Sequence, residues 1–226
     1  MKLLAIETAT EACSAALAID GEIEQRFAIA PREHASRILH MTDELMAEAG
    51  LSVNQLDAIA FGRGPGSFIG VRIAAGVTQG IAFAANLPVV PVSTLAAIAQ
   101  GSQFDHLLVA IDARMSEIYF GQYARSSESG MVSSCMSEVL LPPLSATVEE
   151  PRPEYEWVGI GTGWQTYKDE LMQRFPHVRQ IDEQHFPSAK SVAQLAEPMV
   201  KAGQVVSPAE ALPVYLRDQV AEKPNK

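Results

Sequence analysis

Two segments about half the chain apart share one pattern, and this repeat limits the folds that the chain can adopt. KLLAIETATEACSAALAI begins at Lys2, and LLVAIDARMSEIYFGQYA begins at Leu107. When the two are aligned, Glu7 falls on Asp112, and each segment reads as an apolar strand, a turn that starts with an acidic residue, and a second strand. Internal similarity at this scale indicates a duplicated architecture in which each half opens with a strand-turn-strand unit.

The rest of the first half alternates between strand and helix patterns. Asp20-Gly21 lies between two strand-like runs and predicts a hairpin, so that residues 2–29 should form a three-stranded antiparallel meander. The elements expected after it are a helix over 38–49, a strand over 56–61, a helix over 68–85, a strand over 89–92 and a short helix over 93–99. This order predicts an α/β fold.

The second half is less regular in sequence. Residues 126–134 resemble a hairpin loop, and a proline-rich stretch follows before the next strand pattern. The expected elements there are a strand over 156–160, a turn over 161–163, and helices over 164–174 and 191–202.

The charge balance argues against a direct grip on nucleic acid. The 226 residues include 17 Lys and Arg against 27 Asp and Glu, a net charge of −10, and no basic half or tail is present. The two cysteines, Cys13 and Cys135, match no zinc or redox spacing. The N-terminal apolar run is too short for a signal peptide, and Pro88 and Pro91 interrupt the most apolar stretch, so we expect a cytoplasmic protein without a membrane span.

The sharpest local motif is GRGPGSFIGVRI, which runs from Gly62 to Ile73. It follows an expected strand and opens a helix, where backbone N–H groups and the helix dipole can hold a phosphate. The motif lacks the Gly-Lys-Ser/Thr of a P-loop, and Ser67 replaces the third glycine of a dinucleotide fingerprint. The alternative is a tight turn in which Ser67 caps the helix.

The helix after this turn carries small residues on one face. Gly76, Gly80 and Ala84 recur at steps of four, with Gly70 and Ala74 on a neighbouring line. A glycine inside a helix costs about 1 kcal/mol relative to alanine, so two on one face indicate that another backbone approaches closely. That partner is either the helix over 38–49 of the same chain or a helix of another subunit.

Candidate ligands for a metal or a phosphate are few. His34 and His40 are six residues apart and point to different sides of a helix, and the other histidines have no partner at ligand spacing, so no metal site is expected. Glu7 and Asp112 are candidate cation-handling carboxylates that would face each other across a cleft between the halves. Thr8 and Thr10 make the first turn partly suitable for holding a phosphate, and the second turn has no such hydroxyls.

Five segments of the chain form a recognisable set: LLAIETATEACSAAL, HASRILHMTDEL, GRGPGSFIGVRI, DARMSEIYFGQY and VYLRD. Taken in this order, they resemble the TsaB (YeaZ) family of bacterial accessory subunits in threonylcarbamoyladenosine synthesis on tRNA. The resemblance covers the whole chain, with Ile69 where the family most often has Thr.

The resemblance implies an actin/sugar-kinase/Hsp70-like duplicated α/β fold with two subdomains, each a mixed sheet flanked by helices. We expect an N-terminal subdomain over 1–104 and a C-terminal one over 105–226, whose last segment packs back on the first. The implied partners are the catalytic paralogue TsaD, the ATPase TsaE and, when the chain is alone, a second copy of itself, with tRNA contacted only indirectly.

The differences from TsaD-like proteins bear on catalysis. Those proteins carry a His-x-x-x-His metal site, and this chain has Thr94 and Ile98 at the matching places, neither of which can replace an imidazole. The chain is therefore expected to be a noncatalytic subunit without a cofactor, with at most residual nucleotide contact at Glu7, Thr8, Thr10 and Asp112. The expected partner surface comprises Ile38, Met41, Leu45, Gly70, Ala74, Gly76, Val77, Gly80 and Ala84.

An enzyme in its own right is the alternative. A nucleotide-hydrolysing relative of the sugar kinases would need a two-sided phosphate grip, and a glycoprotease-like metallopeptidase would need a metal site. The sequence contains neither a complete two-sided phosphate-binding motif nor a complete set of metal ligands.

Overall fold

The first repeat lies at the centre of a five-stranded mixed sheet in the computed structural model, which describes residues 1–149, 152 and 154–217. The strand order is β3-β2-β1-β4-β5. Strands β1, β2 and β3 pair antiparallel, which confirms the predicted meander, and β4 and β5 continue parallel to β1. Their bounds are β1 (Lys2–Glu7), β2 (Ala12–Ile19), β3 (Glu22–Ile29), β4 (Ala58–Gly62) and β5 (Val89–Val92).

The second repeat builds a second sheet with the same plan. The order β11-β10-β6-β7-β8 again places the first strand of the repeat at the centre, its antiparallel partner on one side and two parallel strands on the other. The bounds are β6 (His106–Arg114), β7 (Glu117–Arg125), β8 (Val132–Ser134), β9 (Val139–Leu141), which also pairs with β7, β10 (Trp157–Ile160) and β11 (Gln180–Asp182). The matching orders confirm the duplication that the repeat predicted.

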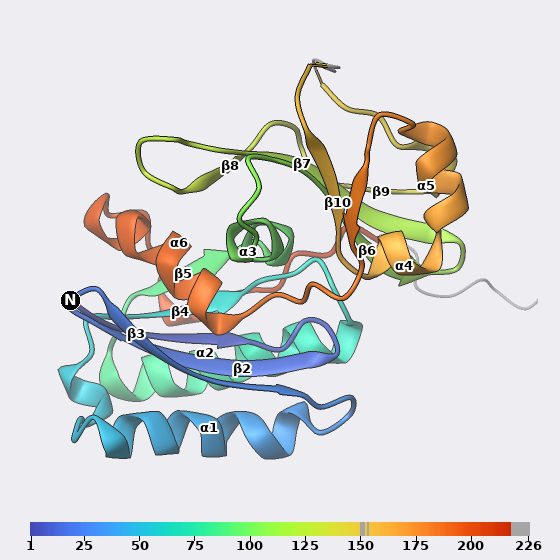
Figure 1. Ribbon diagram of the computed structural model, residues 1–226. Coiled ribbons are helices and arrows are strands. Elements are labelled where there is room, and N and C mark those ends of the chain that lie inside the picture. The colour runs from blue at the N-terminus through green and yellow to red at the C-terminus, as the bar shows by residue number, and fades with distance from the viewer. Residues whose placement is uncertain (150–151, 153, 218–226) are drawn as a thin grey trace, which may run out of the picture.

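Helices cover both sheets (Figure 1). Helices α1 (His34–Glu48) and α2 (Phe68–Ala85) pack on the outer face of the first sheet, and α3 (Thr94–Gly101) lies between the two sheets. Helices α4 (Thr162–Thr166) and α5 (Lys168–Arg174) cover the outer face of the second sheet. Short 3₁₀ turns occur at Val53–Gln55, Pro143–Ser145 and Pro208–Glu210.

The last helix, α6 (Ala189–Lys201), returns to the first sheet. Val192, Ala193 and Ala196 are fully buried against residues of β1, β4 and β5, in a core made mostly of alanine and valine. These small side chains let the helix lie close to the sheet. The C-terminal part of the chain therefore ties the two halves together.

One predicted helix is wrong in detail. The helix expected over 164–174 is divided into α4 and α5, because Tyr167 leaves helical geometry with φ of −122°. The break accompanies the burial of Trp164, whose Nε1–H donates a hydrogen bond to the Leu108 carbonyl at 2.8 Å. A buried indole N–H needs such a partner.

Candidate functional site

The first two residues of the first repeat's turn, Glu7 and Thr8, are closed off from solvent. Glu7 at the end of β1 is fully buried, and its carboxylate accepts hydrogen bonds from the Ala9 N–H at 2.6 Å and the Thr94 hydroxyl at 3.2 Å. Burial raises the pKa of Glu7 to about 7, and these hydrogen bonds only partly oppose the rise. The carboxylate occupies the space beside Gly62, where a side chain would collide with it.

Helix α2 begins directly on this turn. The Thr8 hydroxyl donates a hydrogen bond to the Gly70 carbonyl at 2.8 Å, and the Ser67 N–H donates one to the Ala9 carbonyl at 2.7 Å. A methyl group at Gly70 would lie 2.1 Å from the Thr8 carbonyl oxygen, so only glycine permits this approach. Ser67 caps α2 by accepting a hydrogen bond from the Gly70 N–H, which confirms the tight-turn interpretation of the motif.

A cleft of about 500 Å³ separates the two halves. Of the four residues expected to contact a nucleotide, Thr10 and Asp112 line it. Glu7 and Thr8 are buried behind the cleft wall, so the expectation that Glu7 faces Asp112 across the cleft is wrong. The reason is that the Glu7 carboxylate turns inward to the Ala9 N–H and the Thr94 hydroxyl.

The turn of the second repeat lies at the cleft and is strained. Arg114, Met115 and Ser116 all have positive φ, between 55° and 63°, a backbone conformation that residues other than glycine rarely adopt. Asp112 accepts hydrogen bonds from the backbone N–H and the guanidinium of Arg114, at 2.7 and 2.8 Å. The acidic group is thus already engaged by a cation of its own turn.

The C-terminal segment holds this turn in place. Arg217 donates a hydrogen bond to the Ala113 carbonyl at 3.1 Å and forms an ion pair with Glu117 at 2.7 Å. Upstream, the Val214 N–H donates to the Arg63 carbonyl of the first half at 2.8 Å. The VYLRD segment therefore links the halves through Val214 and Arg217, while its last residue, Asp218, lies outside the described residues.

One face of α2 is open. A methyl group at Gly76 or Gly80 would meet no atom of the described residues within 4 Å, Ala84 is exposed and Val77 is half-buried. Ile69 and Phe83, which the sequence analysis did not select, lie on the same face with 69% and 82% of their surfaces exposed. Their spacing from Gly76 and Gly80, at steps of three, four and seven, is the signal that could have identified them. We call Ile69, Gly76, Gly80, Phe83 and Ala84 the open α2 face.

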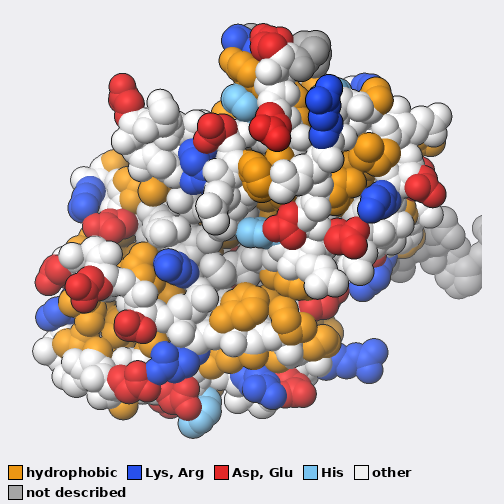
Figure 2. Space-filling model, viewed as in Figure 1, with side chains coloured by type: hydrophobic (Ala, Val, Ile, Leu, Met, Phe, Trp, Pro, Cys, Tyr) orange, Lys and Arg blue, Asp and Glu red, His pale blue; other side chains and the backbone are white. Residues whose placement is uncertain are grey.

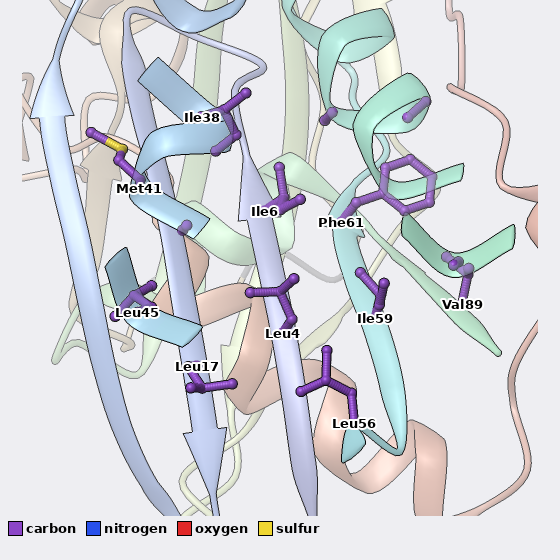
Figure 3. Packing of buried hydrophobic residues seen from close by; sticks show 14 of the residues in the cluster. Leu4, Ile6, Leu17, Ile38, Met41, Leu45, Leu56, Ile59, Phe61 and Val89 are labelled. Atoms are coloured by element: carbon purple, nitrogen blue, oxygen red, sulfur yellow. The ribbon is translucent and has the colours of Figure 1, made fainter. Parts of the chain in front are cut away.

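The other residues expected at a partner surface belong to the core of this chain. Figure 3 places Ile38, Met41 and Leu45 of α1 over Leu4, Ile6 and Leu17 of the first sheet. The three α1 side chains are 8% exposed or less, Ala74 is fully buried, and Gly70 contacts Thr8. Assigning these five to a partner surface was an error, because periodicity identifies an apolar face but not what covers it.

The positions compared with a metal site have structural roles. Thr94 donates its hydroxyl to Glu7, and Ile98 is packed between the halves. Within the described residues, no group of three or more His, Cys, Asp and Glu side chains could hold a metal ion. By length and composition alone, α2 would be long and apolar enough to cross a membrane, which is weak evidence because its other face packs on the first sheet.

Comparisons with known proteins agree with this architecture. The sequence model of the TsaD family, described as tRNA N6-adenosine threonylcarbamoyltransferase, matches residues 28–225. The tRNA threonylcarbamoyladenosine biosynthesis protein TsaB of Escherichia coli strain K12 is 42% identical over 99% of this chain and 97% of its own length. Its counterpart in Haemophilus influenzae is 39% identical over 99% and 96%. The structure of YeaZ from Pseudomonas aeruginosa superposes with a TM-score of 0.89 at 43% identity, covering 95% of this chain and 99% of that one.

The duplicated sheets and the cleft between them define a protein of the actin/sugar-kinase/Hsp70-like class, with each half a mixed sheet flanked by helices. The sequence identity of about 40% to two TsaB proteins, over nearly the full length of both chains, identifies the family within this class. The chain belongs to the TsaB (YeaZ) family.

Proposed function

We propose that the protein is a noncatalytic subunit in the formation of threonylcarbamoyladenosine on tRNA, and that it acts by binding a TsaD-like catalytic paralogue in the cytoplasm. The E. coli and H. influenzae relatives are named for the biosynthesis of this nucleoside. A TsaE-like ATPase is the third component. The observation that carries the proposal is the open α2 face.

This face suits a helix of a homologous protein. Phe83 and Ile69 supply apolar surface, and the glycines between them let a second helix approach to about 8–10 Å between axes. Contiguous exposed apolar surface of this kind marks interaction sites in soluble proteins. When the paralogue is absent, two copies of the chain can use the same face in a twofold dimer.

The first turn supports the noncatalytic role. Its acidic residue and its first hydroxyl are directed into the protein, where they bind Thr94 and Gly70. The remaining cleft residue pair, Thr10 and Asp112, would offer only residual contact to a nucleotide.

Indirect contact with tRNA is supported by charge. The chain carries a net charge of −10, and on the face drawn in Figure 2 the basic side chains are scattered among acidic ones. The catalytic partner would then hold the tRNA.

Gly80→Leu tests the interface. The leucine side chain blocks close helix approach, so the variant should lose co-elution with the paralogue and should not restore modification in a reconstituted assay. Lys190→Leu, which adds the same side chain to an exposed position of α6, should leave both unchanged. Gly80→Ala should bind with intermediate strength while stabilising the free chain. Undiminished complex formation by Gly80→Leu would reject this surface.

The alternative is an enzyme that hydrolyses a nucleotide in the 500 Å³ cleft. Calorimetry of the isolated chain with ATP and Mg²⁺ separates the two. Micromolar binding accompanied by phosphate release would support the enzyme, and absence of heat would support the subunit.

A further inference from the structure

Arg72 is the only charged residue of α2, and it lies in line with the open α2 face. It precedes Gly76, Gly80 and Ala84 at the same steps of four, so the four residues share one side of the helix. The side chain of Arg72 is exposed. A single cation among uncharged residues gives an interface one point at which partners are distinguished by charge.

Two aromatic rings hold the guanidinium of Arg72. Its central carbon lies 3.2 Å from the centre of the Phe68 ring and 4.9 Å from the centre of the Tyr215 ring. The centres of the two rings are 6.1 Å apart, and 51% of Phe68 and 45% of Tyr215 are exposed. Attraction between a cation and the faces of aromatic rings restricts the side chain, so less side-chain entropy is lost when a partner binds.

The C-terminal segment places Tyr215 beside α2. The Val214 N–H donates a hydrogen bond to the Arg63 carbonyl at 2.8 Å, and the Gln79 side chain of α2 donates one to the Ala211 carbonyl at 3.2 Å. These bonds hold the segment along the helix on both sides of the exposed apolar Leu212. The ring beside the guanidinium is therefore fixed by tertiary contacts far along the chain.

The guanidinium of Arg72 has no acidic partner in the described part of the chain. Its one hydrogen bond there runs from Nη1 to the Phe68 carbonyl, one turn earlier in the same helix, at 3.1 Å. Arg26 and Arg217, in contrast, each form an ion pair with a glutamate of this chain. Arg72 thus keeps N–H donors for an acceptor from outside the chain. The acceptor that best matches a guanidinium is a carboxylate, which it binds through two parallel hydrogen bonds.

We propose that Arg72 selects the partner at the open α2 face by pairing with an Asp or Glu carboxylate on the facing helix of the catalytic paralogue. This inference rests on the proposed function, because it names the chemistry that the same interface requires. Phe68 and Tyr215 flank the ion pair and limit its contact with water, which strengthens it. The α2 helix of a second copy cannot supply the carboxylate, since α2 contains no Asp or Glu. Arg72 therefore favours the paralogue over self-association.

The first measurement compares Arg72→Met with the wild type. Methionine keeps an unbranched apolar stem and removes the charge. Calorimetric titration of the full-length protein with the TsaD-like paralogue should show binding at least about tenfold weaker for the variant. Because part of the site stays exposed to water, salt screens the ion pair. The difference should therefore shrink to about threefold or less when NaCl is raised from about 0.05 M to about 0.5 M.

Self-association provides a second measurement. Because α2 has no carboxylate to offer Arg72 in a twofold dimer, Arg72→Met should not weaken self-association in analytical ultracentrifugation. A general distortion of the face would weaken both assemblies alike. Equal losses in the two assemblies would therefore overturn the inference, as would a loss of paralogue binding that does not depend on salt.

Charge reversal identifies the partner group. Arg72→Glu should bind the paralogue more weakly than Arg72→Met does, because it places two carboxylates together. Arg72→Lys should fall between Arg72→Met and the wild type, since lysine keeps the charge but not the planar two-bond geometry. Each exposed Asp and Glu on the facing helix of the paralogue is then changed to Lys, one at a time. One of these changes should restore binding to Arg72→Glu, and no rescue by any of them would reject the ion pair.

Two controls separate this inference from the proposed function. Arg179→Met removes an exposed arginine from the second half and should bind the paralogue as the wild type does at both salt concentrations. Gly80→Leu tests the face itself. If Gly80→Leu abolishes binding while Arg72→Met binds as the wild type does, the ion pair is rejected and the interface stands. If Gly80→Leu binds normally, or if the wild type does not bind the paralogue, both the interface and the ion pair are rejected.

Discussion

The turns of the two repeats occupy equivalent places in their sheets, but their acidic residues have different surroundings. In the first, Glu7 is buried and binds groups of its own half, at Ala9 and Thr94. In the second, Asp112 lies at the cleft and is paired with Arg114. Both turns sit against a helix start that brings glycine close, Gly70 on Thr8 and Gly163 on Ala110.

The two copies of the turn therefore differ in what is energetically unfavourable: a buried carboxyl group in the first and a left-handed backbone in the second. The first turn has ordinary backbone geometry and a buried acid whose pKa is raised by burial, whereas the second has an acid paired with an exposed arginine and three consecutive left-handed residues. The first turn is stabilised by packing and the second by side chains that reach it from outside.

The largest expected effect is on the packed turn. Gly70→Ala would place a methyl group 2.1 Å from the Thr8 carbonyl oxygen, and because both atoms belong to backbone elements the clash cannot be relieved by a rotamer change. We expect a loss of about 3 kcal/mol or more in the free energy of unfolding, measured with urea. Gly76→Ala on the same helix has open space and should gain about 1 kcal/mol. Equal free energies of unfolding for the two variants would show that the backbone at Thr8 shifts to accommodate the methyl group at little cost.

The buried acid should make stability depend on pH. Glu7 has a pKa of about 7 when folded and 4.5 as a reference, so the folded protein holds a proton that the unfolded chain has released between those values. Stability should therefore fall as pH rises from 4.5 to 7, by about 3 kcal/mol in total from this group.

Glu7→Gln isolates that contribution, because the amide oxygen can still accept the Ala9 N–H without a charge. In this variant, the free energy of unfolding should no longer show the fall between pH 4.5 and 7 that Glu7 causes. At pH 8 the variant should be more stable than the wild type by about 2–3 kcal/mol in urea unfolding. Asp112→Asn, the matched change in the second turn, should keep the wild-type slope. A wild-type slope in Glu7→Gln would assign the pH dependence to another group.

The pairing of the first three strands and the duplication could be predicted from the sequence. Alternating apolar residues and the Asp20-Gly21 turn determine the conformation of neighbouring residues, so their effect can be read without tertiary structure. The burial of Glu7 could not be predicted from the sequence. The space beside Gly62 and the hydroxyl of Thr94 come from residues far along the chain, and only tertiary structure brings them to the carboxylate.

The helix faces show the same limit. The glycine spacing of α2 predicted that another helix packs closely on Gly76 and Gly80. No described residue of this chain covers them, so a helix of another subunit stays the prediction there. The equally regular apolar line of α1 covers the first sheet, and no feature of that line distinguishes a core-facing side from a partner-facing one. The strained backbone at Met115 also had no sequence signal, because the residue is not glycine.

A smaller effect is expected where the second turn is held from outside. Arg217→Ala removes a hydrogen bond to the Ala113 carbonyl and the ion pair with Glu117. The turn keeps its left-handed residues but loses their support, so we expect a loss of about 2 kcal/mol and faster hydrogen exchange at residues 113–117. Arg32→Ala, a substitution at another arginine of the same cleft, should leave exchange in that turn unchanged. Unaltered exchange in Arg217→Ala would mean that the turn is stable by itself.

The smallest effect is expected at the acid of the second turn. The Arg114 side chain that pairs with Asp112 is 76% exposed, although the Asp112 side chain is only 8% exposed. Water can therefore replace the carboxylate as the partner of the guanidinium, and ion pairs with an exposed partner contribute about 1 kcal/mol or less. Asp112→Asn retains an oxygen that can accept the Arg114 N–H, which keeps the turn geometry. Urea unfolding should therefore differ from the wild type by less than about 1 kcal/mol, and the difference should shrink further at high salt because the lost term is Coulombic. A cost comparable to that of Gly70→Ala would mean that the two turns carry equal structural weight, and the contrast between a packed first turn and an externally supported second turn would not hold.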